Sequence, residues 1–84
     1  MVDKNAVKRF LNDVWLAAEQ NGWPVNAMEI GVQLFGGGEE LARHCTQEVL
    51  GECTTRGYFT TKPTFEFDIH GLSETAKTLI GVQG

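Results

Sequence analysis

The sequence predicts an α+β fold, with three helices followed by a two-stranded β-hairpin and a short C-terminal helix. Two periodicities carry this prediction. Apolar residues recur at helical spacing through residues 4–21 and again through 39–56, whereas apolar and polar residues alternate strictly through 64–69. A length of 84 residues leaves room for one domain with a single modest core, which we expect to extend over about residues 4–81 of 1–84.

The first helix is expected over residues 4–21. Asp3 is a suitable N-cap, and Gly22 followed by Pro24 is a typical helix stop. One stripe of this helix carries its apolar residues, which are Ala6, Val7, Phe10, Leu11, Val14, Trp15 and Ala18. We expect Trp23, in the short extended link that follows, to fill a place in the core.

The second helix is expected over residues 27–34, because Asn26 and Glu29 have the spacing of an N-cap and its acidic partner. Gly31 lowers the helix propensity of this segment and predicts a close approach to another helix. A run of three glycines ends the helix. The apolar residues offered for burial are Met28, Ile30, Val32, Leu34 and Phe35.

The third helix is expected over residues 39–56, with two acidic residues in its first turn and Arg56 in its last. At about 100° per residue, one side gathers Ala42, Cys45, Thr46, Val49, Leu50 and Cys53. The opposite side carries the polar residues Glu40, Arg43, His44, Gln47, Gly51, Thr54 and Thr55. Gly57 is suited to end the helix in a left-handed conformation.

The hairpin is expected from strands 58–61 and 64–69, joined by a turn at Lys62 and Pro63. Alternation places Phe65, Phe67 and Ile69 on the face that packs against the helices. A final helix follows over residues 72–80, capped by Ser73 and ended by Gly81.

Charge, hydropathy and cysteine content exclude several classes of protein. The seven Lys and Arg residues against eleven Asp and Glu give a net charge of −4, which disfavours strong non-specific binding of nucleic acid. No apolar run approaches the roughly 20 residues that a membrane span needs, so we expect no membrane association. Cys45 and Cys53 lie about 12 Å apart along one helix, too far to form a disulfide with each other. Reduced thiols favour a cytoplasmic protein.

The residues predict neither an enzyme nor a metal site. His44 and Cys45 are adjacent on a helix and therefore point about 100° apart, and His70 lies far along the chain. Ser73 is explained as a helix cap and the cysteines as small buried residues, which leaves no candidate nucleophile. We expect no catalytic residues, no metal and no small-molecule cofactor.

Two stretches resemble the winged helix-turn-helix superfamily, and small bacterial and phage proteins of it in particular. The stretch VLGECTTRGYF resembles the end of a recognition helix that enters the first wing strand. FDIHGLSETAKTLIG resembles the second wing strand and the start of the trailing helix. The resemblance covers about residues 26–81, and it implies a winged-helix domain in which residues 39–56 form the recognition helix.

The resemblance implies a DNA-binding protein that regulates transcription. Gln47 would read adenine, and Arg43 would reach guanine or a phosphate. Thr54 and Thr55 would contact the DNA backbone, and Lys62 at the wing tip would contact the minor groove or a phosphate. His44 is a further candidate for a base or phosphate contact. Because one such module binds weakly, we expect a homodimer on duplex DNA.

The charge of the same elements supports an alternative function. Residues 39–56 hold four acidic and two basic side chains, a net charge of −2. Many DNA-reading winged helices carry more basic recognition helices, and winged helices also serve as protein-docking modules. The alternative is therefore an acidic protein-interaction module that binds a basic protein partner and no DNA.

Overall fold

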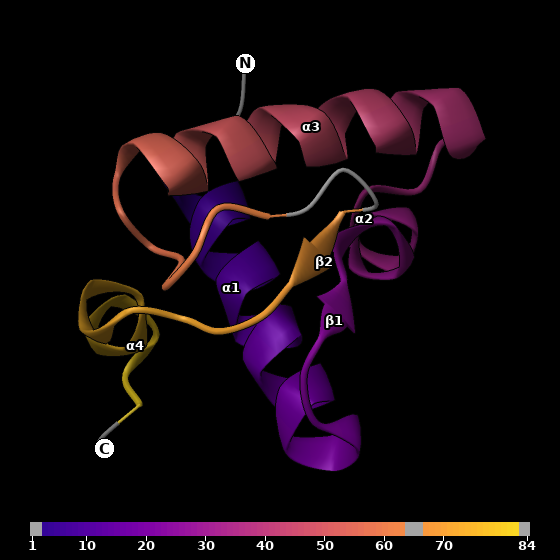
Figure 1. The fold of residues 1–84 in the computed structure, drawn as a ribbon. Helices are drawn as coiled ribbons and strands as arrows, with labels where there is room; N and C mark the ends of the chain where they lie inside the picture. The colour runs from indigo at the N-terminus through magenta and orange to yellow at the C-terminus, as the bar shows by residue number, and fades with distance from the viewer. Residues whose placement is uncertain (1–2, 64–66, 83–84) are drawn as a thin grey trace.

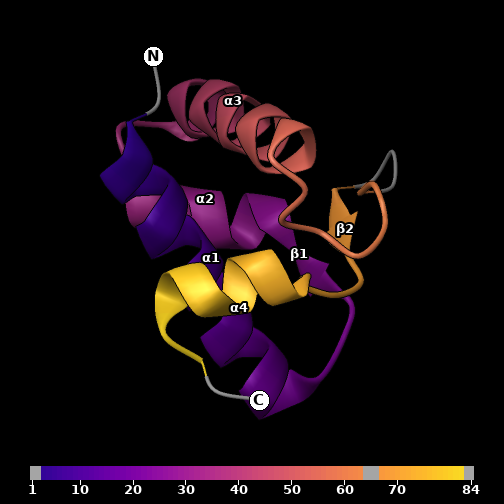
Figure 2. The ribbon, with the colours of Figure 1, turned by 90° about the vertical axis from the view of Figure 1, so that its left-hand side faces the viewer.

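Helix α1 (Lys4–Asn21) runs through the middle of the molecule, and α2 (Ala27–Phe35) and α3 (Glu39–Thr55) pack against it and against each other (Figure 1). The structure is a computed structural model that describes residues 3–63 and 67–82. Within this part of the chain the fold is α+β, as predicted, with four helices and a two-stranded antiparallel sheet. Helix α3 crosses above α1 and α2, and this places one of its sides at the surface (Figures 1 and 2).

The helix caps predicted from the sequence are present. The Asp3 carboxylate accepts a hydrogen bond from the Ala6 N–H at 2.7 Å, and the Asn26 side chain accepts one from the Glu29 N–H at 3.1 Å. The stops at the glycines hold as well, so the four helices begin and end within two residues of the predicted positions. None of the helices in the described segments combines the length and the apolar character needed to cross a membrane.

The sheet is formed by β1 (Val25–Asn26) and β2 (Asp68–Ile69), with Val25 opposite Ile69 and Asn26 opposite Asp68. The Ala27 N–H donates a hydrogen bond to the Phe67 carbonyl at 2.8 Å and extends this pairing by one step. The strand that follows α3 in sequence is therefore paired with the link between α1 and α2.

The predicted hairpin pairing is wrong in the described residues. Tyr58 and Thr60 pair with residues 71–73, beyond the predicted second strand, through an isolated bridge between Phe59 and Leu72 and flanking backbone hydrogen bonds of 2.9 and 3.3 Å. Phe67 has a left-handed backbone with φ of 65°, so the alternation does not continue through it, and its side chain is half-buried. Ile69 is fully buried, as predicted. Phe65 lies outside the described residues.

The core is centred on α1, whose buried residues are Val7, Phe10, Leu11, Val14 and Ala18. These side chains meet Ile30, Val49, Ile69 and Leu72 from the surrounding elements. Two predicted core positions are exposed instead. Trp23 is 38% exposed and Val32 is 47% exposed.

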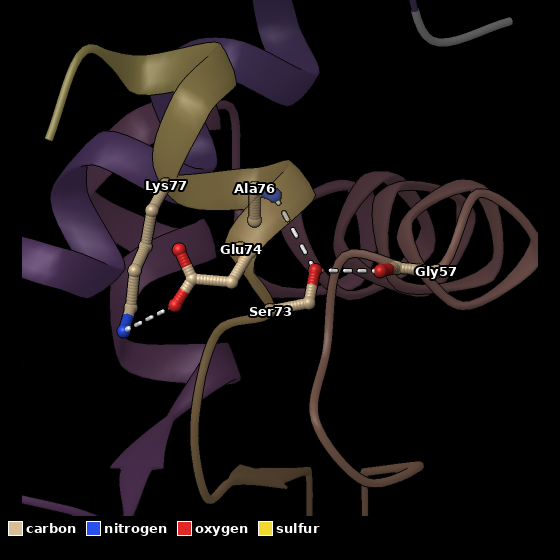
Figure 3. A network of polar contacts seen from close by, with 5 residues as sticks. All are labelled: Gly57, Ser73, Glu74, Ala76 and Lys77. Atoms are coloured by element: carbon tan, nitrogen blue, oxygen red, sulfur yellow. Dashed lines mark hydrogen bonds and ion pairs between the residues drawn. The ribbon is translucent and has the colours of Figure 1, made fainter. Parts of the chain in front are cut away.

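Helix α4 (Glu74–Ile80) packs on α1 and fixes the end of α3 (Figures 2 and 3). The Ser73 hydroxyl donates a hydrogen bond to the Gly57 carbonyl at 2.6 Å and accepts one from the Ala76 N–H at 3.3 Å. The Lys77 ammonium lies 5.7 Å from the centre of the Trp15 ring, which joins α4 to α1. One serine therefore caps α4 and also satisfies the carbonyl that follows α3.

Candidate nucleic-acid interface

The close contact between α2 and α3 sets the position of the candidate interface. A Cβ atom on Gly31 would lie 1.7 Å from the Thr46 Oγ1 and 3.0 Å from the Thr46 Cβ, so the two helices meet where α2 has no side chain. Thr46 is fully buried, and its hydroxyl donates a hydrogen bond to the Ala42 carbonyl at 2.6 Å. The sequence prediction of a close approach at Gly31 is confirmed.

One stripe along the exposed side of α3 carries three of the predicted contact residues. Arg43, Gln47 and Thr54 are separated by four and seven positions, which places them within an arc of about 40° on the helix. All three are exposed. We call this set the α3 stripe. Its spacing allows one extended ligand to contact all three side chains.

His44 is exposed as predicted, but it lies about 100° from Arg43 around the helix. Its Nε2 is 3.1 Å from the Glu48 Oε1, and Glu48 in turn lies on the far side of α3 from the stripe. His44 therefore lies beside an acidic partner and away from Arg43, Gln47 and Thr54 around the helix.

Arg43 also has an acidic neighbour, because its guanidinium lies 3.9 Å from the Glu39 carboxylate. Both side chains are more than half exposed, so water screens this pair. At the end of the helix, the Arg56 Nε donates a hydrogen bond to Glu52 at 2.8 Å, and this bond raises the pKa of that guanidinium. These two pairs and the contact of His44 with Glu48 all join residues four positions apart on α3, a spacing that can be read from the sequence.

The remaining predicted residues line a groove at the C-terminal half of α3. This groove, which we call the α3–Lys62 groove, has a volume of about 380 Å³. Thr54, Thr55 and Lys62 form its polar part, and the residues of its apolar part are Leu50, Gly51, Pro63 and Phe67. Nothing lies within 4 Å of the position that a Cβ on Gly51 would take, so the helix backbone is accessible there.

A second, larger groove was not predicted from the sequence. It lies between α2 and the first turn of α3, has a volume of about 840 Å³, and is called here the α2–α3 groove. The residues that define it are Met28, Glu29, Val32, Gln33, Glu39 and Arg43. Alternating apolar residues in α2 could have revealed it, because a helix with a period of 3.6 cannot bury positions 28, 30, 32 and 34 on one face.

The two cysteines are free thiols, in agreement with the predicted absence of a disulfide between them. Burial raises the pKa of the Cys53 thiol to about 12, with a smaller contribution from the neighbouring Glu52 carboxylate. Cys53 is therefore an unreactive core residue, whereas Cys45 is half-buried. Across the described residues, no group of three His, Cys, Asp or Glu side chains is placed to hold a metal ion.

Comparison with protein-family models, with curated proteins and with solved structures finds no match to this chain.

Proposed function

We propose that this chain is a small winged-helix protein that binds duplex DNA through α3, as a regulator of transcription. The observation that carries the proposal is the joining of two sets of polar residues on one side of the molecule. The α3 stripe holds Arg43, Gln47 and Thr54, and Thr54 also lines the α3–Lys62 groove with Thr55 and Lys62. One cationic and one amide side chain, Arg43 and Gln47, thus share the exposed side of α3, and Lys62 lies at the groove beside its C-terminal half.

The fold supports the winged-helix part of this proposal. Helix α3 packs on α2 through Gly31 and Thr46, and a short strand between α1 and α2 pairs with the strand that follows α3. A pair of packed helices with the second one exposed is the arrangement that places a recognition helix in a major groove. Lys62 lines a groove together with residues of α3, which supports a wing at this place beside a recognition helix.

Two of the four acidic residues of α3 lie away from the stripe. Glu48 and Glu52 are five and nine positions beyond Arg43, at about 140° and 180° from it around the helix. Glu39 and Glu40, in the first turn, are the acidic residues closest to the stripe. A phosphate that approaches Arg43 must therefore compete with Glu39 for the guanidinium.

The experiment that tests the proposal is a titration of labelled duplexes of random sequence at low salt, followed by fluorescence anisotropy. Binding should be tighter than about 10⁻⁴ M, the weak end of ordinary non-specific affinity. Lys62→Ala should weaken binding to all sequences about equally and reduce the salt slope by about one unit. Arg56→Ala is the matched control, because it removes the same charge from the side of α3 opposite to the stripe and should change affinity less.

A gain-of-binding variant sharpens this test. Glu39→Gln removes the carboxylate 3.9 Å from Arg43 without changing the size of the side chain, and it should tighten DNA binding about two- to fivefold. Glu52→Gln removes the same charge from the opposite side of α3 and should have a smaller effect. Equal effects of the two variants, or no wild-type binding tighter than about 10⁻⁴ M, would refute the proposed interface.

A second candidate function is a protein-interaction module that binds a basic partner. The ion pair of Arg43 with Glu39 favours it, because it reduces the positive charge that α3 offers to DNA. Acidic surfaces steer basic partners by long-range attraction. Affinity capture from a cognate lysate, repeated at high salt, separates the two functions. Salt-sensitive capture of nucleic acid supports DNA binding. Capture of a basic protein without nucleic acid supports the protein-interaction module.

A further inference from the structure

The α2–α3 groove combines an apolar floor with an acidic edge. Met28 is half-buried in it, and Val32 is 47% exposed although it lies in the middle of a helix. Glu29 and Glu39 stand at the edge, and Glu40 lies next to Glu39 in the first turn of α3. Arg43 offsets only part of this negative charge. The groove therefore fits a helix that carries an apolar side chain together with basic ones.

The outer side of α1 has the complementary chemistry. Lys4, Lys8, Asn12 and Leu16 recur every four residues and are all exposed, so they form one stripe, called here the α1 outer stripe. Leu16 is 49% exposed and is, like Val32, a large apolar side chain left open to water. Lys8 and Lys4 lie about 12 and 18 Å before it along the helix axis.

From this complementarity we propose that the α2–α3 groove binds the α1 outer stripe of a second copy of this chain. Leu16 of one copy packs against Val32 and Met28 of the other, and Lys4 and Lys8 lie against the carboxylates of Glu29 and Glu39. The association removes two exposed apolar side chains from water and pairs opposite charges at the edge. Each copy offers one groove and one stripe.

Charge is what selects a second copy over other occupants. Within the described residues, the first six residues of α1 contain three basic side chains, Lys4, Lys8 and Arg9, and no acidic one. The groove is lined by two glutamates, Glu29 of α2 and Glu39 of α3, and Glu40 follows Glu39 in the chain. The two surfaces are of opposite sign on one chain whose net charge is −4. When two copies are related by a two-fold axis, the α1 outer stripe of each lies in the α2–α3 groove of the other, and assembly stops at a dimer. Without that symmetry, the same contact would add copies one after another.

This proposal does not depend on DNA binding, and its test contains no DNA. Sedimentation velocity of the wild-type protein at about 50 mM salt, where charges act over more than 10 Å, should show a mass that rises with concentration. We expect a dissociation constant between about 10 µM and 1 mM, typical of a small and partly polar contact. The association should weaken as salt is raised to about 1 M.

Charge reversal gives the sharpest form of the test. The variant Lys4→Glu/Lys8→Glu and the variant Glu29→Lys/Glu39→Lys should each weaken self-association about tenfold or more. An equimolar mixture of the two should regain a heterodimer, because the acidic α1 of the first then meets the basic groove of the second. Thermal melting followed by circular dichroism shows that each variant is folded before it is compared.

A matched pair of apolar variants tests the floor of the groove. Val32→Ser should weaken self-association, whereas Leu41→Ser removes an equally exposed apolar side chain from α3 outside the groove and should leave it unchanged. A wild-type protein that stays monomeric up to about 1 mM overturns the proposal. So does a charge-reversed mixture that fails to associate. A monomer whose Met28 and Val32 amide signals shift on addition of a Leu- and Lys-rich helical peptide would show a groove for a different protein, and this also overturns it.

Discussion

The contact between Gly31 and Thr46 gives the most direct test of how α2 and α3 are held together. In the structure, a Cβ on residue 31 would lie 1.7 Å from the Thr46 Oγ1, whereas ordinary contacts between heavy atoms are about 3.5–4.0 Å. Gly31→Ala therefore forces one of two changes. Either the helices separate, or the Thr46 side chain rotates away from its place.

Both changes have a cost that the structure allows to be estimated. Moving packed helices apart to admit one methyl group costs about 1–3 kcal/mol. Rotating Thr46 instead breaks its 2.6 Å hydrogen bond to the Ala42 carbonyl and leaves a buried hydroxyl without a partner, at about 1–3 kcal/mol. Replacing glycine by alanine within a helix returns about 1 kcal/mol. We expect Gly31→Ala to lower the free energy of unfolding by about 1–2 kcal/mol.

Gly51 provides the matched control. It also lies within a helix, but no atom lies within 4 Å of the place that its Cβ would take. Gly51→Ala should therefore raise the free energy of unfolding by about 0.5–1 kcal/mol. The two glycine-to-alanine variants should differ in stability by about 2 kcal/mol, which for a domain of this size is about 8–16 °C in melting temperature.

Urea unfolding followed by circular dichroism measures both variants on one scale. The double variant Gly31→Ala/Thr46→Ala identifies the clash, since it removes the oxygen that lies closest to the new methyl group. It should be more stable than the sum of the two single effects predicts, by about 1 kcal/mol. Equal stabilities of Gly31→Ala and Gly51→Ala, or strict additivity in the double variant, would refute this account of the helix pair.

Three further predictions concern the region around the end of α3. Ser73→Ala removes the cap of α4 and the hydroxyl bound to the Gly57 carbonyl, so urea unfolding should show a loss of about 1–2 kcal/mol. Because Phe67 has a left-handed backbone, Phe67→Gly should be at least as stable as Phe67→Ala, which reverses the usual order in a strand; a less stable glycine variant contradicts the conformation. The pKa of Cys53 is about 12 in the folded protein, above the value of 9.0 for an unperturbed thiol, so its contribution to stability is complete below about pH 9. Stability should fall by up to about 1.4 kcal/mol per pH unit between pH 9 and 12 and should lose this slope in Cys53→Ala, as measured by urea unfolding at several pH values.

The helices of this protein could be predicted from the sequence because their signals are local. Asp3, Asn26 and Ser73 each accept a hydrogen bond from the backbone N–H three residues later, and a glycine follows each helix that they begin. Such signals involve neighbours along the chain and need no tertiary information. The close approach at Gly31 was also predictable from the sequence. A glycine within a helix lowers the stability of that helix, and close packing against another helix is a common reason for its presence.

The strand pairing could not be predicted, because it depends on a partner that leaves no pattern. Val25 and Asn26 form a strand of two residues, too short for any alternation to be recognised. The alternation from residue 64 onward suggested one continuous strand, yet the left-handed backbone at Phe67 interrupts it. The register of β2 is set by its pairing with β1, and no local pattern in the sequence indicates that β1 is its partner.

For the candidate contact residues, the sequence predicted which side chains are exposed. It was not used to predict which of them lie beside an acidic residue. The polar side of the third helix was correctly placed at the surface, since a period of 3.6 fixes which residues oppose the core. The contacts of Arg43 with Glu39 and of His44 with Glu48 follow from the same period, at four positions' separation. Val32 was expected in the core from its type alone, and its exposure opens the α2–α3 groove.

The net charge of α3 does not describe the side that carries Arg43, because two of its four acidic residues, Glu48 and Glu52, lie about 140° and 180° from Arg43 around the helix. Glu48 lies beside His44 and Glu52 beside Arg56, whereas the α3 stripe carries one cationic group, Arg43, and Lys62 lines the adjoining α3–Lys62 groove. The pair between Arg43 and Glu39 is exposed and 3.9 Å long, which makes it worth about 0–1 kcal/mol. A DNA phosphate can accept two parallel hydrogen bonds from the Arg43 guanidinium through two of its oxygens, and this is a stronger contact than the 3.9 Å contact with Glu39. If α3 binds DNA as proposed, a backbone phosphate displaces Glu39 at small cost, so the acidic first turn lowers that affinity without abolishing it.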